Sequence, residues 1–123
     1  MIPYIPYTPP MYKRIRNLLN SLAVYPLSPG YQYLEDILEI TTSARRHEYT
    51  SVGMLYEEVA KSHGVTPQCV SAAVRRAIIK AWNTADFELE YKLFGNTILF
   101  KRGAPTSSDF IANTTKYLLI KKR

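Results

Sequence analysis

The sequence has 123 residues, the length of one ordinary domain, and 46% of them are apolar, which is enough to fill a single core. Its formal net charge of +6 and pI of about 9.5 favour a polyanionic partner, either nucleic acid or a membrane surface. Cys69 is the only cysteine, and no apolar run has the length of a membrane span or a signal peptide, so we expect a cytoplasmic protein without a disulfide.

The elements follow one another as short helices. Residues 1–10 contain four prolines and are predicted to form an extended Pro/Tyr-rich arm, before a single domain over residues 11–123. Residues 25–30 interrupt the helical spacing, residues 42–51 are polar and leave their structure open, and residues 96–100 are β-prone but isolated. Ser108 is predicted to cap the last helix. The predicted fold class is all-α, a compact bundle of about six helices. The other helices are predicted at 11–24, 31–41, 53–63, 67–83 and 85–94.

The charged residues are segregated along the chain. Six carboxylates lie between Glu35 and Glu58, where the only lysine or arginine residues are Arg45 and Arg46. No acidic residue occurs from Val59 to Trp82, although this stretch contains four lysines and arginines. The C-terminal tail is again basic. We therefore expect the fold to present one positively charged face.

Residues 56–82 have the spacing of a helix-turn-helix. Ala60 supplies the small residue that two steeply crossing helices need, and Gly64, four residues later, suits a left-handed turn. Thr66 can cap the second helix, and Pro67 fits its first position, where no N–H is needed. Chance matches to this spacing occur in helical proteins, so the pattern alone leaves the motif open.

The second helix of this motif has two faces. One face is apolar (Val70, Val74, Ala77, Ile78 and Ala81), and the opposite face is predicted to read base edges in the major groove. The alternative is a solvated amphipathic helix with a basic outer face, but the short uncharged side chains at its start permit close approach to DNA. The predicted base-reading residues are Gln68, Ser71, Ala72 and Arg75, and the predicted phosphate-binding residues are Thr66, Arg76, Lys80, Lys101 and Arg102.

Several segments together resemble a known family. These are GYQYLEDILEI from Gly30, LYEEVAKSHGVT, VRRAIIKAW, LFGNT and APTSSDFIA. They resemble the C-terminal DNA-binding effector domain of the master sporulation response regulator of endospore-forming bacteria. The resemblance implies a six-helix, all-α domain that binds short promoter boxes in double-stranded DNA, often as tandem copies. A homodimer or tandem dimer on DNA is therefore one arrangement that we expect.

The sequence departs from that family in two ways. A phospho-receiver domain precedes the effector domain in the family, whereas only the short arm precedes it here, so we expect regulation without phosphorylation in cis. The DNA-facing arginines and glutamate of the family correspond to Cys69, Ser71, Ala72 and Arg75, and only Arg75 matches. We therefore expect an altered or relaxed box preference.

Other functions have less support in the sequence. His47 and His63 lack partners at metal-ligand spacing, and no phosphate-binding glycine loop occurs, so we expect no enzyme, no metal and no cofactor. The alternative is a protein-interaction module that titrates a related response regulator through mixed dimers. The loss of DNA-facing arginines favours this alternative, and the basic face opposes it. Binding to a membrane is not expected, since no long basic amphipathic helix is present.

Overall fold

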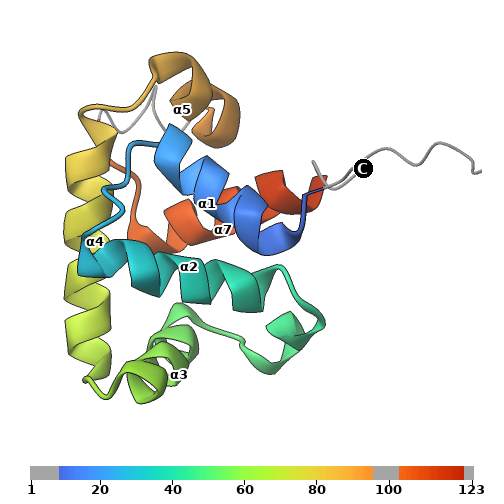
Figure 1. Cartoon of the computed structure of the whole chain (residues 1–123), viewed down its shortest axis with the longest axis vertical. Coiled ribbons are helices and arrows are strands. Elements are labelled where there is room, and N and C mark those ends of the chain that lie inside the picture. Colours follow the sequence, from blue (N-terminus) through green and yellow to red (C-terminus); the bar gives the residue numbers. More distant parts are fainter. Residues whose placement is uncertain (1–8, 96–102, 121–123) are drawn as a thin grey trace, which may run out of the picture.

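The computed structural model describes residues 9–95 and 103–120, and regular structure in both ranges is helical only. The predicted all-α fold is confirmed (Figure 1), with α2 in the middle of the molecule and α4 across its N-terminal end. Residues 1–8 of the predicted arm and the β-prone residues 96–100 lie outside the described ranges. The described helices are α1 (Met11–Ser21), α2 (Pro29–Thr41), the 3-10 helix η1 (Ala44–Glu48), α3 (Val52–His63), α4 (Pro67–Trp82), α5 (Phe87–Phe94) and α7 (Ser107–Ile120).

The first helix ends three residues earlier than the predicted boundary at Val24. Ala23 adopts a left-handed conformation with φ of 65°. Its N–H donates to the carbonyl of Asn20, and the N–H of Val24 donates to the carbonyl of Leu19, both at 3.0 Å. This conformation costs a non-glycine residue roughly 1 kcal/mol. The turn nevertheless buries Leu22 and Val24 on either side of Ala23, which explains why the helix stops there.

Pro29 and Gly30 begin α2, although the sequence pattern suggested that they would only separate two helices. The hydroxyl of Ser28 accepts the N–H of Tyr31 at 3.4 Å and caps the helix. Proline is suited to the first helical position because its missing N–H would have no partner there. The helix therefore starts two residues before the predicted Tyr31, and Gly30 lies inside it.

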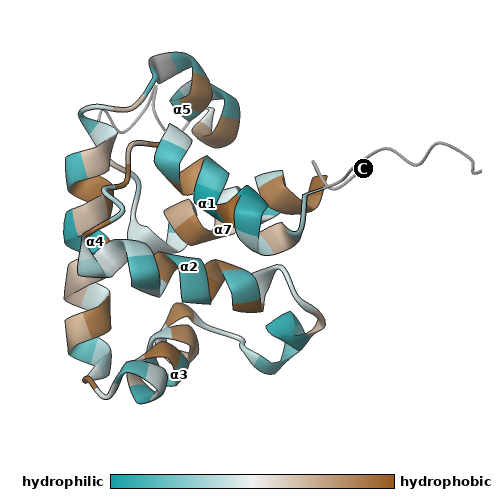
Figure 2. Cartoon of the chain, viewed as in Figure 1, coloured by the Kyte–Doolittle hydropathy of each residue, from teal (hydrophilic) through white to brown (hydrophobic). Residues whose placement is uncertain are grey.

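The core lies where α2 contacts α1, α3, α4 and α7. Bands of apolar and polar residues alternate along the helices (Figure 2), as expected for helices with one buried face. Within the described ranges, no helix has both the length and the apolar character needed to cross a membrane. The largest fully buried side chains are Ile15, Leu19, Leu22, Val24, Leu34, Ile37, Leu38, Val59, Val70, Ile78, Phe110 and Leu118.

Aromatic rings join the end of α4 to α5 and α7. Phe94 meets Trp82 edge to face at 5.2 Å between ring centroids and stacks on Phe110 at 5.7 Å.

Gly95, with φ of 48°, ends α5 as predicted. The predicted cap of the last helix at Ser108 is wrong, because the hydroxyl of Thr106 accepts the N–H of Asp109 at 3.1 Å and α7 already begins at Ser107. The N–H of Phe110 also donates to the Thr106 carbonyl, in the register that buries Phe110.

Glu90 of α5 is a buried carboxylate, with 5% of its surface exposed. Its Oε2 atom has no hydrogen-bond partner in the part of the chain that the structure describes. Burial first, and then the charge of Asp86, raise the pKa of Glu90 above its usual range. The folded chain thus holds this proton more tightly than the unfolded chain. Stability is therefore greatest below the unfolded pKa and falls as the pH rises through the folded pKa.

Glu90→Gln is expected to raise the free energy of unfolding at neutral pH by about 1 kcal/mol, because an uncharged amide replaces a buried carboxylate with an unpaired oxygen. Below the unfolded pKa the carboxyl is already neutral, so the gain should largely disappear. Urea denaturation, followed by circular dichroism at several pH values, measures the gain at neutral pH and its loss at low pH. Glu88→Gln, at an exposed position of the same helix, is the control. If Glu90→Gln raises the free energy of unfolding equally at all pH values, the raised pKa of Glu90 is not the cause of the gain.

Candidate nucleic-acid interface

The turn between α3 and α4 is closed by backbone hydrogen bonds. Gly64 adopts the left-handed conformation, with φ of 65° and ψ of 33°. Its N–H donates to the carbonyl of Lys61 at 3.4 Å, and the N–H of Val65 donates to that of Ala60 at 3.0 Å. This pair of bonds is a Schellman motif. Because Ala60 is also buried, the structure confirms the predicted roles of the small residue and of the glycine in the turn.

The beginning of α4 also follows its predicted chemistry. The hydroxyl of Thr66 accepts the N–H of Cys69 at 3.1 Å, and Pro67 occupies the first position of the helix. One face of α4 is buried against the rest of the molecule, so the opposite face of the helix is directed toward solvent. The buried residues are Val70, Ala73, Val74, Ala77, Ile78 and Ala81, so the predicted apolar stripe is confirmed, as is the expected packing of Ala73 against the rest of the motif.

The four residues predicted to read bases lie together. Gln68, Ser71, Ala72 and Arg75 all line one open hollow, whose other wall includes Gly53, Tyr56 and Glu57 of α3. Gln68 and Ala72 are exposed, whereas Ser71 and Arg75 are half-buried. The structure thus brings these side chains to one side of α4, within reach of a ligand that approaches the helix-turn-helix.

Arg75 has a contact that the sequence did not predict. Its Nη1 donates to the backbone carbonyl of Pro105, 30 residues further along the chain, at 2.6 Å. The guanidinium also lies near Tyr56: burial raises the pKa of Tyr56, while a hydrogen bond with Ser107 and the charge of Arg75 act in the opposite direction. Arg75 therefore ties α4 to the segment before α7. A guanidinium has further N–H groups, so this bond leaves donors available.

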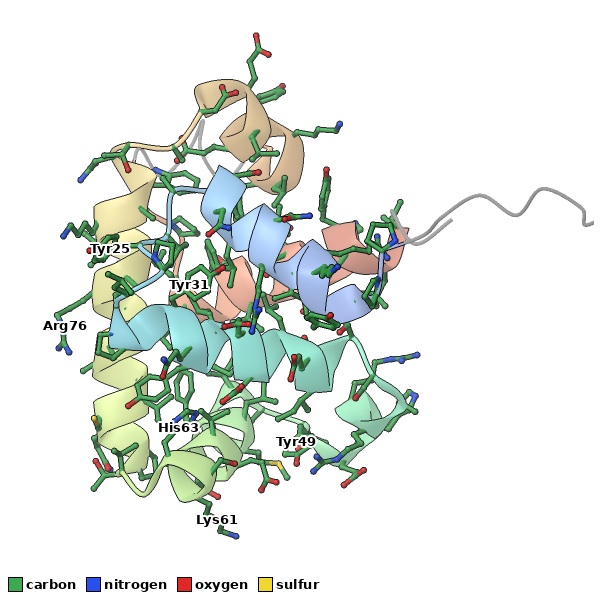
Figure 3. All side chains as sticks on the ribbon, in the orientation of Figure 1. Tyr25, Tyr31, Tyr49, Lys61, His63 and Arg76 are labelled. Atoms are coloured by element: carbon green, nitrogen blue, oxygen red, sulfur yellow. The ribbon has the colours of Figure 1, made fainter. Side chains whose placement is uncertain are left out.

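Three of the predicted phosphate-binding residues lie on α4 or at its cap. Arg76 is exposed and extends away from the body of the molecule (Figure 3), and Thr66 and Lys80 are exposed as well. Lys61 of α3, which is not among the predicted phosphate-binding residues, also extends into solvent near the turn. The remaining candidates, Lys101 and Arg102, lie outside the described residues.

An ion pair and a histidine contact engage carboxylates of the acidic stretch on α2 and α3. Nε2 of His63 lies 2.5 Å from Oδ2 of Asp36, and Nη2 of Arg45 lies 3.3 Å from Oε1 of Glu58. The α4 segment itself contains no carboxylate. Among the described residues, no three histidine, cysteine or acidic side chains are grouped so that they could hold a metal ion. The side that α4 presents to solvent thus has no negative charge on the helix itself, as a surface that approaches DNA requires.

A comparison with protein families agrees with this geometry. The family described as "Sporulation initiation factor Spo0A C terminal" matches residues 15–118 of the 123-residue chain. The match spans all helices described here from the core of α1 to the last turns of α7, including the helix-turn-helix of α3 and α4. The chain belongs to the Spo0A C-terminal family of helical DNA-binding domains that regulate transcription.

Proposed function

We propose that this chain binds specific sequences in double-stranded DNA by placing α4 in the major groove. The observation that carries this proposal is the solvent-facing side of α4. It presents uncharged short side chains at its start and the exposed Arg76 and Lys80 further along, with no carboxylate on the helix. An α-helix with this arrangement fits the width of the groove and its donor and acceptor pattern.

The proposed base contacts come from residues 68–75 of α4. Gln68 can pair with adenine and Arg75 with guanine, because each side chain offers two hydrogen-bonding groups to one base edge. Ser71 and Ala72 are small enough to let the helix approach the bases. Since Arg75 is the single match to the family's DNA-facing residues, the preferred box of this chain is expected to differ from the family's.

DNA binding is expected to weaken steeply with salt. Contacts with about four to six phosphates would give a slope of roughly −4 to −5 in a plot of log affinity against log salt concentration. The lysine and arginine candidates for these contacts are Arg76, Lys80, Lys101 and Arg102. Fluorescence anisotropy with a labelled duplex, selected from a random library, measures the slope. Arg76→Gln should reduce its magnitude by about one phosphate contact.

The alternative is a protein-interaction module that titrates a related response regulator through mixed dimers. This alternative is supported by the uncharged residues at three of the four DNA-facing positions of the family, Cys69, Ser71 and Ala72. The salt titration distinguishes the two functions. Absence of binding to any duplex at low salt, together with a mixed dimer in analytical ultracentrifugation, would favour the alternative.

A further inference from the structure

An apolar pocket of about 490 Å³ lies between the C-terminal half of α4 and the turn that joins α1 to α2. This volume falls in the range of small-molecule sites. One wall is formed by the small side chains of Ala77 and Ala81, which leave room beside the helix. The lining residues are Asn20, Ala23, Val24, Tyr25, Pro26, Ser28, Ala77, Lys80, Ala81 and Thr84.

The turn opposite α4 leaves apolar side chains in contact with water. Tyr25, which lines the pocket, is 53% exposed, and Leu27, between two lining residues, is 81% exposed. The left-handed Ala23 holds this turn in its position although the conformation is unfavourable for alanine. A ligand with an apolar body in the pocket would bury part of the Tyr25 side chain that the chain alone leaves in water.

Among the described residues that line this pocket, Lys80 is the one with a charged side chain. Its Nζ lies 5.7 Å from the centroid of the Tyr25 ring, an arrangement that keeps the ammonium beside the pocket (Figure 3 shows Tyr25 next to α4). None of the described lining residues carries a carboxylate. The pocket therefore attracts an anionic group and disfavours a cationic one.

We propose that this pocket binds a small amphipathic carboxylate, with its apolar body against Ala77 and Ala81 and its carboxylate beside Lys80. Lys80 is also a proposed phosphate contact, so the bound acid and a DNA duplex would compete for the same ammonium. This competition rests on the proposed function, whereas binding of the acid does not. Binding of a metabolite-sized acid in the pocket would thus weaken the binding of α4 to DNA.

The test uses the ¹⁵N-labelled 123-residue chain and three probes that share one apolar body: phenylbutyrate, phenylbutanol and phenylbutylamine. Phenylbutyrate is expected to shift the amide signals of residues 20–28 and 77–84, with a dissociation constant on the order of 1 mM. Phenylbutanol should bind several-fold more weakly, and phenylbutylamine more weakly still. Shifts outside these residues, no shifts, or equal binding of the amine would overturn the proposal.

Two variants separate the contribution of the Lys80 charge to ligand binding from that of the apolar contact. Lys80→Met keeps an apolar side chain of similar length and should abolish the preference for phenylbutyrate over phenylbutanol, while binding of phenylbutanol persists. Lys61→Met, which removes an exposed lysine of α3, should leave the preference unchanged. A preference that survives in Lys80→Met would overturn the role of Lys80.

In a separate assay, phenylbutyrate should weaken duplex binding of the unmodified chain a few-fold. If only this effect is absent, the competition with DNA is disproved, whereas the proposed binding of the acid in the pocket still holds.

Discussion

Gly30→Ala is expected to lower the free energy of unfolding by about 2 kcal/mol or more. A Cβ atom at this position would lie 2.5 Å from the carbonyl oxygen of Ala73 and 2.6 Å from the Cβ of Ala77. These are backbone or short side-chain atoms of α4 that cannot rotate away, so the two helices must separate. The helix propensity of alanine, worth up to about 1 kcal/mol, offsets only part of this cost. Urea denaturation of both chains measures the difference.

Gly53→Ala is the matched control for Gly30→Ala. Both glycines follow a serine cap by two residues, Ser28 before α2 and Ser51 before α3. A Cβ at Gly53 would meet only the Oγ of Ser51, at 3.7 Å, which is an ordinary contact. This variant should therefore be neutral or stabilising by about 0.5 kcal/mol. If both substitutions change the free energy of unfolding equally, the close approach of α2 and α4 at Gly30 is not the cause of the loss of stability.

The same contact connects stability with DNA binding. Gly30 lies at the N-terminal end of α2, where this helix crosses the middle of α4 (Figure 1). Displacement of α4 at Ala73 and Ala77 would move its buried face, and with it the side chains on its outer face. Gly30→Ala is therefore also expected to weaken duplex binding at temperatures where the variant is still folded.

The features that the sequence predicted correctly depend on neighbours in the chain. The turn of the helix-turn-helix needs a left-handed residue, and Gly64 adopts this conformation at lowest cost. Thr66 and Pro67 fit the first positions of a helix for local hydrogen-bonding reasons. The apolar stripe of α4 follows from helical periodicity alone. These signals act over a few residues, so the sequence contains them in full.

The features that were missed depend on contacts between distant segments. The sequence pattern predicts that Pro29 and Gly30 separate two helices. Only the packing of Gly30 against Ala73 of α4 explains why a glycine lies inside α2. Ala23 has no local preference for a left-handed conformation, and burial of its neighbours imposes it. The bond from Arg75 to Pro105 joins residues 30 positions apart. No local pattern could have indicated these contacts.

Arg75→Ala is expected to reduce the difference in affinity between the preferred duplex and random DNA by about 1–3 kcal/mol, the discrimination of one bidentate contact with guanine. Arg76→Ala and Lys80→Ala should instead weaken both duplexes together, because phosphates are the same in every sequence. A competition titration of each variant against both duplexes measures the ratio. Equal weakening of both duplexes by Arg75→Ala would identify Arg75 as a phosphate contact.

Arg75→Lys separates base reading from the contact with Pro105. Lysine keeps the positive charge and can donate one hydrogen bond to the carbonyl that Nη1 of Arg75 reaches at 2.6 Å. It lacks the planar fork that pairs with two acceptors of guanine. If Arg75 reads a base, Arg75→Lys should retain affinity for random DNA and lose the discrimination that Arg75→Ala loses. Full discrimination in Arg75→Lys would show instead that Arg75 acts by holding the segment before α7 against α4, and that Gln68 and its neighbours read the bases.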